Sequence, residues 1–397
     1  MIYDAVIVGG GACGLMCAVQ AGYLGKKVLV LEKNDKAGAK ILISGGGRCN
    51  YTNLYASPAN FLSQNEHFCT ATLARWTVED TINFFETNGI FGQEKTLGQL
   101  FPTSNKAKDV VAVFERLMKE LGQDLLLNSE VTAISQEDSQ LFNVHYKHLH
   151  RQETIQSKTV VMASGGLPIA KMGASDFSIK IAKQFGLRVV PTAPALVPLT
   201  ITGKDAEWFG ALAGNSVFCR VSNEKISFEE NILFTHWGLS GPAILQISSY
   251  WQPGESITLN LLPQQDVTAI IQAERLKGGK RLLLHVLQDL FTRKFAEALG
   301  KYLAVDKKIA SMSKAEAQQV HQTIHHFQIK PAGDKGYDKA EVMRGGVDTN
   351  ELSSKSLEAL KCKGMFFGGE CVDVTGWLGG YNFQWAWASG YVIAQHI

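Results

Sequence analysis

The chain has 397 residues, of which 45% are hydrophobic and 19% are charged, and its formal net charge at pH 7 is +2. This length and composition predict a globular protein of two or three domains, and the small net charge argues against a nucleic-acid partner. The odd number of cysteines, without a C-x-x-C pair, argues against a secreted disulfide framework. With no basic leader and no apolar run of membrane-spanning length, we expect a cytoplasmic protein without a membrane partner.

The first predicted element is a buried parallel strand over residues 3–8, which leads into a glycine-rich turn and a helix. Gly9, Gly11 and Gly14 match the pattern GxGxxG, whose glycines permit a tight turn, close approach of a pyrophosphate and close helix–strand packing. The pyrophosphate would rest on the exposed N–H groups at the start of the helix, near Ala12. This turn predicts a dinucleotide site.

A second buried strand, residues 27–31, ends in Glu32. A carboxylate at this place can accept hydrogen bonds from both hydroxyls of an adenosine ribose, and it would repel a 2′-phosphate. An ordinary βαβ unit with a glycine-rich bend is the alternative, which the full context of strand, turn, helix and acidic residue disfavours. We therefore expect a dinucleotide with an unphosphorylated ribose.

A second glycine-rich segment, residues 44–50, reads Ser-Gly-Gly-Gly-Arg-Cys-Asn. Its backbone predicts a further anion cradle, in which Arg48 adds a positive fork for a phosphate and Ser44 and Asn50 supply short hydrogen-bonding groups. A flexible loop is the alternative. The proximity of the dinucleotide turn favours the cradle.

The chain then reads as mostly helical over residues 58–125, with a short strand at 131–134 and a hairpin through 142–150. A buried strand at 159–163 runs directly into Ser164-Gly165-Gly166. Because cofactors are held at the carboxyl edge of parallel sheets, small residues at the end of this strand suit such an edge.

A change of composition at Pro191, Pro194 and Pro198 marks a domain boundary, after which short strands predict a small antiparallel barrel or sandwich. His236 lies in this region, before a Gly-Pro turn. We nominate His236 as the best candidate general acid or base, because an imidazole titrates near working pH. A role in structuring the turn is an equal alternative.

Residues 263–327 read as helical, and strands return at 329–347. His321 and His325 share one helical face at i, i+4, but no glutamate motif accompanies them, so we expect core or surface histidines and no metal site. The small basic cluster 277–281 reads as a solvated loop.

The last segment again combines a strand, a glycine-rich turn and a helix. A strand at 365–367 ends in two glycines and Glu370, and a second glycine turn, residues 379–382, precedes a helix over 383–394. The Asp373 carboxylate can accept hydrogen bonds from a sugar-alcohol chain, and the N–H groups of the turn can bind a carbonyl oxygen or ring nitrogen. A cofactor held at both ends of the chain is long and extended, which favours a flavin dinucleotide over a nicotinamide.

These segments supply the predicted cofactor-binding residues. They are Gly9, Gly11, Ala12, Gly14, Glu32, Lys33, Lys40, Ser44, Gly45, Gly46, Arg48, Cys49, Asn50, Val131, Ala163, Ser164, Gly165, Gly369, Glu370, Asp373, Gly379, Gly380, Tyr381 and Asn382. Cys49 and Cys371 could each lie near the flavin as a redox-active pair, but buried inert thiols are the favoured reading.

The combination of the first glycine turn, Glu32, the segment 44–50, the string from Phe234 to Pro242 and the turn 379–382 resembles one flavoprotein family. This is the bacterial aminoacetone oxidase-like family, which includes the bile-acid-inducible flavoprotein N. The resemblance spans essentially the whole chain and implies a glutathione-reductase-like FAD domain interrupted by an insert. It also implies that the Val131 backbone touches adenine and that Arg48, Asp373 and the turn 379–382 contact FAD. Ala39 departs from the expected longer polar residue.

We therefore expect an α/β fold with a Rossmann-like FAD-binding domain over 1–190 and 346–397. A β-barrel domain over 191–262 and 328–345 and a helical insert over 263–327 would interrupt it. The expected activity is that of an FAD-dependent oxidoreductase on an unknown small molecule, with NAD(P)H as a transient reductant or dioxygen as an acceptor. An FAD-dependent tRNA-modifying or nucleic-acid-binding flavoprotein is the alternative, and the oligomeric state is left open.

Overall fold

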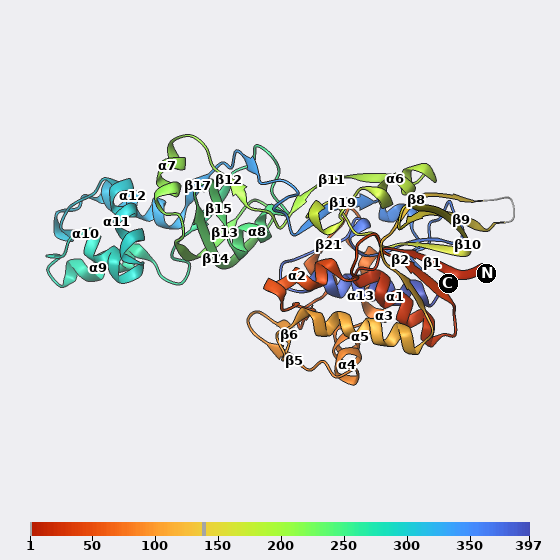
Figure 1. The fold of residues 1–397 in the computed structure, drawn as a ribbon. Helices are drawn as coiled ribbons and strands as arrows, with labels where there is room; N and C mark the ends of the chain where they lie inside the picture. The colour runs from red at the N-terminus through yellow and green to blue at the C-terminus, as the bar shows by residue number, and fades with distance from the viewer. Residues whose placement is uncertain (1, 137–139) are drawn as a thin grey trace. The chain divides into compact units, whose positions relative to one another are not determined.

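The computed structural model describes residues 2–136 and 140–397. This part of the chain divides into two compact units. The first unit comprises the residues up to Ala193 together with Val342–Ile397, and the second unit comprises Pro194–Glu341. Figure 1 shows the elements of each unit along the chain.

The first unit is built on a mixed sheet with the strand order β7-β2-β1-β10-β9-β8, in which β20 also pairs with β10. β1 pairs in parallel with β2 and β10, so that Val8 aligns with Leu31 on one side and with Met162 on the other. A strand with parallel neighbours on both sides is buried on both faces, which is why Ala5 to Val8 form an unbroken apolar run. The strands are β1 (Ile2–Val8), β2 (Val28–Leu31), β7 (Asp124–Leu126), β8 (Ser129–Gln136), β9 (Phe142–His148), β10 (Arg151–Met162) and β20 (Met365–Phe367).

The first and last helices pack against each other beside this sheet (Figure 1). Gly390 lets them approach closely, because a Cβ there would lie 2.5 Å from the Cys13 carbonyl oxygen. The fully buried Trp385 and Trp387 fill the space around α13. The helices of this unit are α1 (Ala12–Tyr23), α2 (Ala39–Gly47), α3 (Phe68–Arg75), α4 (Val78–Thr87), α5 (Ala107–Glu120), α6 (Phe177–Gln184) and α13 (Tyr381–Ala394).

Short strands complete the first unit. They form the pairs β21–β4 and β11–β19 and the sheet β3-β6-β5. Their bounds are β3 (Thr52–Asn53), β4 (Phe61–Leu62), β5 (Gly92–Glu94), β6 (Gln99–Pro102), β11 (Val189–Ala195), β19 (Val342–Val347) and β21 (Thr375–Gly376). The predicted α/β class with a parallel sheet core is confirmed.

The second unit combines an antiparallel sheet with a group of helices. The strand order is β17-β16-β13-β14-β15-β12-β18. Its strands are β12 (Leu199–Thr200), β13 (Ser216–Ser222), β14 (Ser227–Thr235), β15 (Gly238–Ser240), β16 (Ile257–Asn260), β17 (Phe327–Ile329) and β18 (Gly333–Asp334). Its helices are α7 (Lys204–Ala211), α8 (Pro242–Ser248), α9 (Val267–Leu276), α10 (Leu283–Leu290), α11 (Arg293–Leu303) and α12 (Lys314–His325).

Among the residues that the structure describes, every helix is too short or too polar to cross a lipid bilayer.

Candidate functional site

The first glycine turn has the geometry of a phosphate-binding turn. Gly9 has a φ of +108°, and a Cβ there would lie 2.5 Å from the Ala163 carbonyl oxygen, so only glycine fits between the ends of β1 and β10. A Cβ on Gly14 would collide with the Gly9 carbonyl oxygen. A Cβ on Gly11, by contrast, would meet no described atom within 4 Å. Gly11 therefore leaves open space at the start of α1, where the helix presents its first N–H groups.

Glu32 is held at the end of β2 by two backbone hydrogen bonds. Its side chain is 8% exposed and accepts from the N–H groups of Gly10 at 2.7 Å and Asn34 at 2.9 Å. Each carboxylate oxygen keeps a second lone pair for a ribose hydroxyl. The Ser129 N–H donates to the Glu32 carbonyl at 2.8 Å, so β8, which carries Val131, begins beside this carboxylate.

The segment 44–50 is a broken helix end rather than a plain loop. α2 loses its helical dihedrals at Ser44, and Gly45 and Gly46 follow with φ values of +55° and +69°. The Ser44 hydroxyl donates to the Ile41 carbonyl at 2.8 Å, so this oxygen can offer a ligand only its lone pairs. A Cβ on Gly46 would meet no described atom within 4 Å. The main groups that this segment can offer to a ligand are thus the backbone groups of its glycines.

Arg48 is exposed and oriented by its neighbours. Its Nε donates to the Gly45 carbonyl at 2.8 Å, and its guanidinium carbon lies 5.2 Å from the centre of the Phe101 ring. Within the described residues, the two Nη groups make no hydrogen bond. They remain the donors that a phosphate would use.

Lys40 and Glu370, which were predicted from opposite ends of the chain, form an ion pair with Nζ and Oε2 2.6 Å apart. The other Glu370 oxygen accepts from the Met343 N–H at 3.2 Å. Their charges are therefore satisfied within the protein, and a cofactor would contact an already neutralised pair. Ser164, which was also predicted as a cofactor-binding residue, follows the end of β10. Its hydroxyl lies 2.6 Å from the hydroxyl of Ser178.

Residues 50–53, at the end of the second glycine-rich segment, contact the last glycine turn, residues 379–382. The Asn53 side-chain amide donates to the Gly379 carbonyl at 2.8 Å, and a Cβ on Gly380 would lie 2.9 Å from Asn50 Oδ1. Asn50 Oδ1 is buried and has no hydrogen-bond partner among the described residues. An orphaned buried acceptor is costly unless a ligand supplies a donor. This observation fits an FAD molecule that extends from the first glycine turn to the last one.

Asp373 is preorganised as an acceptor. It is 5% exposed, and it accepts from the Gln64 N–H at 2.9 Å. Burial raises the pKa of this carboxyl above its ordinary value, and the hydrogen bond from Gln64 works in the opposite direction. Asn382 has a different role, since its side-chain amide bonds both the N–H and the carbonyl of Gly376 at 2.8 and 2.9 Å. Its side chain holds the turn together, so contact with FAD would come from its backbone.

The cysteines have the properties of inert buried thiols. Cys49 and Cys371 are fully buried, and burial raises the pKa of each to about 12. The described cysteines form no disulfide. A thiol with so high a pKa is a poor nucleophile at neutral pH, which disfavours a redox-active pair.

His236 is exposed in the turn between β14 and β15 of the second unit. Its neighbour Trp237 lies under the ammonium of Lys335, which is 5.2 Å from the ring centre. The nomination of His236 as an acid or base stays a prediction.

Sequence reasoning missed two residues that shape this site. Gln99 on β6 accepts from the Asn50 amide at 3.2 Å, and its side chain would be met by a Cβ on Gly379 at 3.1 Å. Gln384 accepts from the Thr52 hydroxyl at 2.7 Å and ties α13 to the segment after Asn50. Neither glutamine lies in a recognisable motif, so only the three-dimensional contacts reveal them.

Comparison with known proteins assigns a family and a fold. The model of the family described as "HI0933-like protein Rossmann domain" matches residues 3–396. A relative from Escherichia coli (strain K12), named "Ribosomal RNA dihydrouridine synthase", is 43% identical over 397 residues, covering 100% of this chain and 98% of the relative. A relative from Clostridium scindens, named "3-dehydro-bile acid delta(4,6)-reductase", is 25% identical and covers 98% of this chain and 97% of the relative. The solved structure of 3-ketosteroid delta1-dehydrogenase from Sterolibacterium denitrificans superposes with a TM-score of 0.51 at 13% identity, covering 100% of this chain and 99% of that one, and shares the fold.

One expectation is overturned by these relatives. A protein without a nucleic-acid partner was expected from the small net charge, but the Escherichia coli relative is named for a reaction on ribosomal RNA. The expectation was wrong because net charge averages over the whole chain and conceals local basic surfaces.

Proposed function

The chain belongs to the HI0933-like Rossmann-domain family of FAD-dependent oxidoreductases, and we propose that it reduces uridine in ribosomal RNA to dihydrouridine. The observation that carries this proposal is the 43% identity to the Escherichia coli relative across the full length of both proteins. The similarity includes the second unit, which the nucleotide-binding fold alone does not require. The sequence left two activities open, one on a small molecule and one on a nucleic acid, and we propose the second.

The cofactor site supports a reduction by FAD. Bound FAD supplies the transfer of two electrons. Gly11 and the start of α1 would hold its pyrophosphate, Glu32 its adenosine ribose, and Arg48 would add a positive charge. Asp373 would accept from the sugar-alcohol chain, and the turn 379–382 with Asn50 would hold the flavin end.

The proposed reaction balances with a nicotinamide as the source of electrons. The C5=C6 double bond of uracil gains a hydride equivalent and a proton, and NADH or NADPH becomes the oxidised nicotinamide. The proton must come from water or from a side chain of this protein.

A basic surface in the second unit supports RNA as the substrate. Residues 263–327 contain ten Lys or Arg residues and six Asp or Glu residues, a local excess of positive charge. The segment 279–283 lies beside the segment 307–310, because the Ile309 N–H donates to the Arg281 carbonyl at 2.9 Å and the Ala310 N–H donates to the Gly279 carbonyl at 3.0 Å. This contact brings the cluster 277–281 next to Lys307 and Lys308.

The charges of this surface are only partly neutralised. Arg281 pairs with Asp289 at 2.6 Å, and Lys307 pairs with Glu316 at 2.6 Å. Lys280 and Lys308 are exposed and form no ion pair within the described residues. Exposed lysines of this kind provide the sequence-independent phosphate contacts that dominate affinity for RNA. We call the surface formed by residues 277–281, Lys307 and Lys308 the basic ridge.

A small-molecule reductase is the second candidate. The Clostridium scindens relative carries the name of a bile-acid reductase and aligns over 98% of this chain. The names of both relatives imply a carbon–carbon double bond that takes up hydrogen, so the two candidates share their chemistry and differ in the substrate. The resemblance to aminoacetone oxidase-like proteins would instead make dioxygen the electron acceptor.

Anaerobic stopped-flow measurements distinguish these candidates. The flavin of the purified holoprotein is first reduced with NADH or NADPH, and then mixed with uridine-containing ribosomal RNA, with a conjugated steroid ketone or with dioxygen. We expect RNA to reoxidise the flavin fastest, and the same RNA already carrying dihydrouridine to be inactive. Fast reoxidation by the ketone or dioxygen alone would reject RNA as the substrate.

A further inference from the structure

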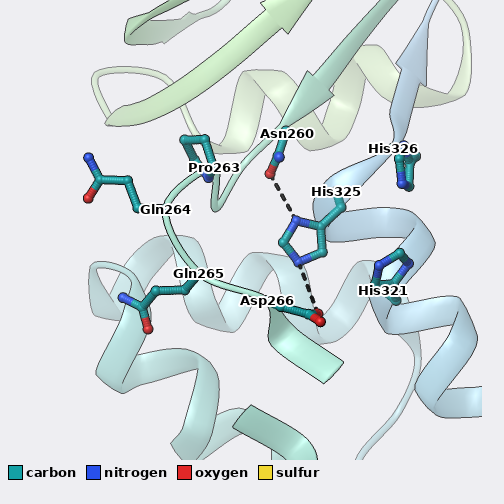
Figure 2. Close-up of a pocket in the computed structure, with 8 residues that line it drawn as sticks. All are labelled: Asn260, Pro263, Gln264, Gln265, Asp266, His321, His325 and His326. Carbon is teal, nitrogen blue, oxygen red and sulfur yellow. Dashed lines mark hydrogen bonds and ion pairs between the residues drawn. The ribbon is translucent and has the colours of Figure 1, made fainter. Parts of the chain in front are cut away.

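A cluster of one carboxylate and two imidazoles lies in the second unit, at the start of α9 and the end of α12. Asp266 is the residue before α9, and His321 and His325 lie one turn apart on α12. One ligand atom from each of the three residues lies within 4.8 Å of the others. Together with Asn260 and His326 they line a pocket of about 390 Å³. Figure 2 shows the side chains that line it.

The His325 ring has the tautomer that a metal ligand needs. Its Nδ1 lies 3.0 Å from Asn260 Oδ1, which also accepts from the Leu262 N–H at 3.1 Å. Because this amide oxygen can only accept, Nδ1 carries the hydrogen, and Nε2 keeps a lone pair. Nε2 lies 4.0 Å from Asp266 Oδ1.

The second imidazole has an unsatisfied nitrogen. His321 Nδ1 is buried and has no hydrogen-bond partner among the described residues. Buried polar atoms are almost always paired, so an orphaned ring nitrogen on a residue of this three-residue cluster points to a missing ligand. The centre of the His321 ring lies 4.9 Å from that of His325.

We propose that Asp266, His321 and His325 form a binding site for a divalent transition-metal ion, with Zn²⁺ as the best match. Two imidazoles and a carboxylate form a ligand set that suits Zn²⁺, and the pocket leaves its fourth position to water. The contact from Nδ1 of His325 to Asn260 is the outer hydrogen bond that orients a ligating histidine. A bound ion would replace the hydrogen bond at 3.1 Å that Nε2 of His325 now accepts from the Val267 N–H.

Such an ion would cross-link two helices in the helical part of the second unit. Asp266 belongs to the start of α9, whereas both histidines belong to the end of α12, so one ion would connect two helices that are distant in sequence. The site differs from the proposed FAD site in its residues and in its chemistry. Its effect would be to stabilise α9, which ends directly before residues 277–281 of the basic ridge.

The test uses the full-length, FAD-loaded protein after treatment with a chelator. Zn²⁺ is titrated in competition with a chromophoric chelator, and thermal unfolding is followed with and without Zn²⁺. We expect one Zn²⁺ per chain and a higher unfolding temperature when it is bound. His321→Ala and Asp266→Asn should each lower the affinity at least about tenfold and remove the thermal shift.

The variants separate ligand loss from misfolding. Asp266 also caps α9 by accepting from the Thr268 N–H, and asparagine caps helices equally well, so Asp266→Asn removes the anionic ligand while it preserves the cap. His326→Ala is the matched control, because His326 lines the pocket but lies outside the three-residue cluster. The proposal is overturned if the wild-type protein binds no Zn²⁺, or if Asp266→Asn and His321→Ala bind it as the wild type does. Equal loss in His326→Ala would overturn the ligand set.

Discussion

Individual residues of the proposed FAD site divide into those whose polar groups bond within the protein and those that leave space or polar groups available to a cofactor. The side chain of Asn382 hydrogen-bonds to the protein backbone, and Lys40 and Glu370 form an ion pair with each other. Gly11, Arg48 and Asn50, by contrast, present open space, guanidinium donors and an orphaned acceptor. The second group should therefore control affinity for FAD with little effect on folding.

Removal of the Arg48 guanidinium should weaken FAD binding without unfolding the protein. A hydrogen bond to a charged group contributes about 1.5–3 kcal/mol, so Arg48→Ala should raise the dissociation constant for FAD by roughly 10- to 100-fold. Flavin retention during gel filtration measures the effect. Arg151→Ala, which removes an exposed guanidinium at the start of β10, is the control. Full flavin retention by Arg48→Ala would refute its assignment as a phosphate ligand.

The Asp373 carboxyl should make the stability of the apoprotein depend on pH, with a sign that follows from the direction of its pKa shift. Burial raises its pKa in the folded state, so the folded protein holds this proton more tightly than the unfolded chain does. The Asp373 carboxyl therefore contributes stability at pH values below its pKa in the unfolded chain. This contribution is lost as the pH rises through its higher pKa in the folded protein. Asp373→Asn should flatten this part of the profile of unfolding temperature against pH, and it should also weaken FAD binding. An unchanged profile would contradict the account.

At the scale of elements, the strand–turn–helix of β1 and α1 separates folding from binding within a few residues. Gly14 is required because the Gly9 carbonyl occupies the place of its Cβ, whereas Gly11 has open space at the same position. The two glycines of one motif thus serve different purposes.

Alanine substitutions should reveal this difference. Gly14→Ala should lower the stability of the apoprotein by about 1–3 kcal/mol, since a tightly packed helix and strand must move apart. Gly11→Ala should change stability by less than about 1 kcal/mol but should abolish tight FAD binding, because its Cβ would occupy the approach to the pyrophosphate. Denaturant unfolding and flavin titration measure the two effects. Equal losses of stability in both variants would contradict this division.

At the scale of the whole molecule, the sequence predicts local features well and long-range contacts poorly. The first glycine turn and Glu32 were recognisable because turn chemistry and strand spacing are local. The pairing of Lys40 with Glu370 spans 330 residues, and no local pattern encodes it. His321 and His325 were visible at helical spacing, but the neighbouring Asp266 was not, because it belongs to another helix. The cluster 277–281 of the basic ridge was visible in the sequence, but its proximity to Lys307 and Lys308 was not, because these lysines are distant from it along the chain.

Charge reversal on the basic ridge should weaken RNA binding selectively. The double substitution Lys280→Glu and Lys308→Glu should lower affinity for ribosomal RNA, and the slope of affinity against salt should fall by about one for each lost phosphate contact. Filter-binding titrations at several salt concentrations give both quantities. Lys147→Glu on the exposed side of β9 is the control, and flavin content should be unchanged in all variants. Wild-type affinity and slope in the double variant would exclude the ridge from the RNA interface.

We propose that this FAD-dependent oxidoreductase makes dihydrouridine in ribosomal RNA. The most direct test is incubation of the purified holoprotein and NADPH or NADH with ribosomal RNA that lacks this modification, followed by mass spectrometry of the released nucleosides. We predict that dihydrouridine accumulates at a defined position, that it requires the reduced nicotinamide, and that Arg48→Ala slows its formation unless FAD is added in excess. RNA that remains unmodified while the flavin is demonstrably reduced and reoxidised by another acceptor would contradict the account.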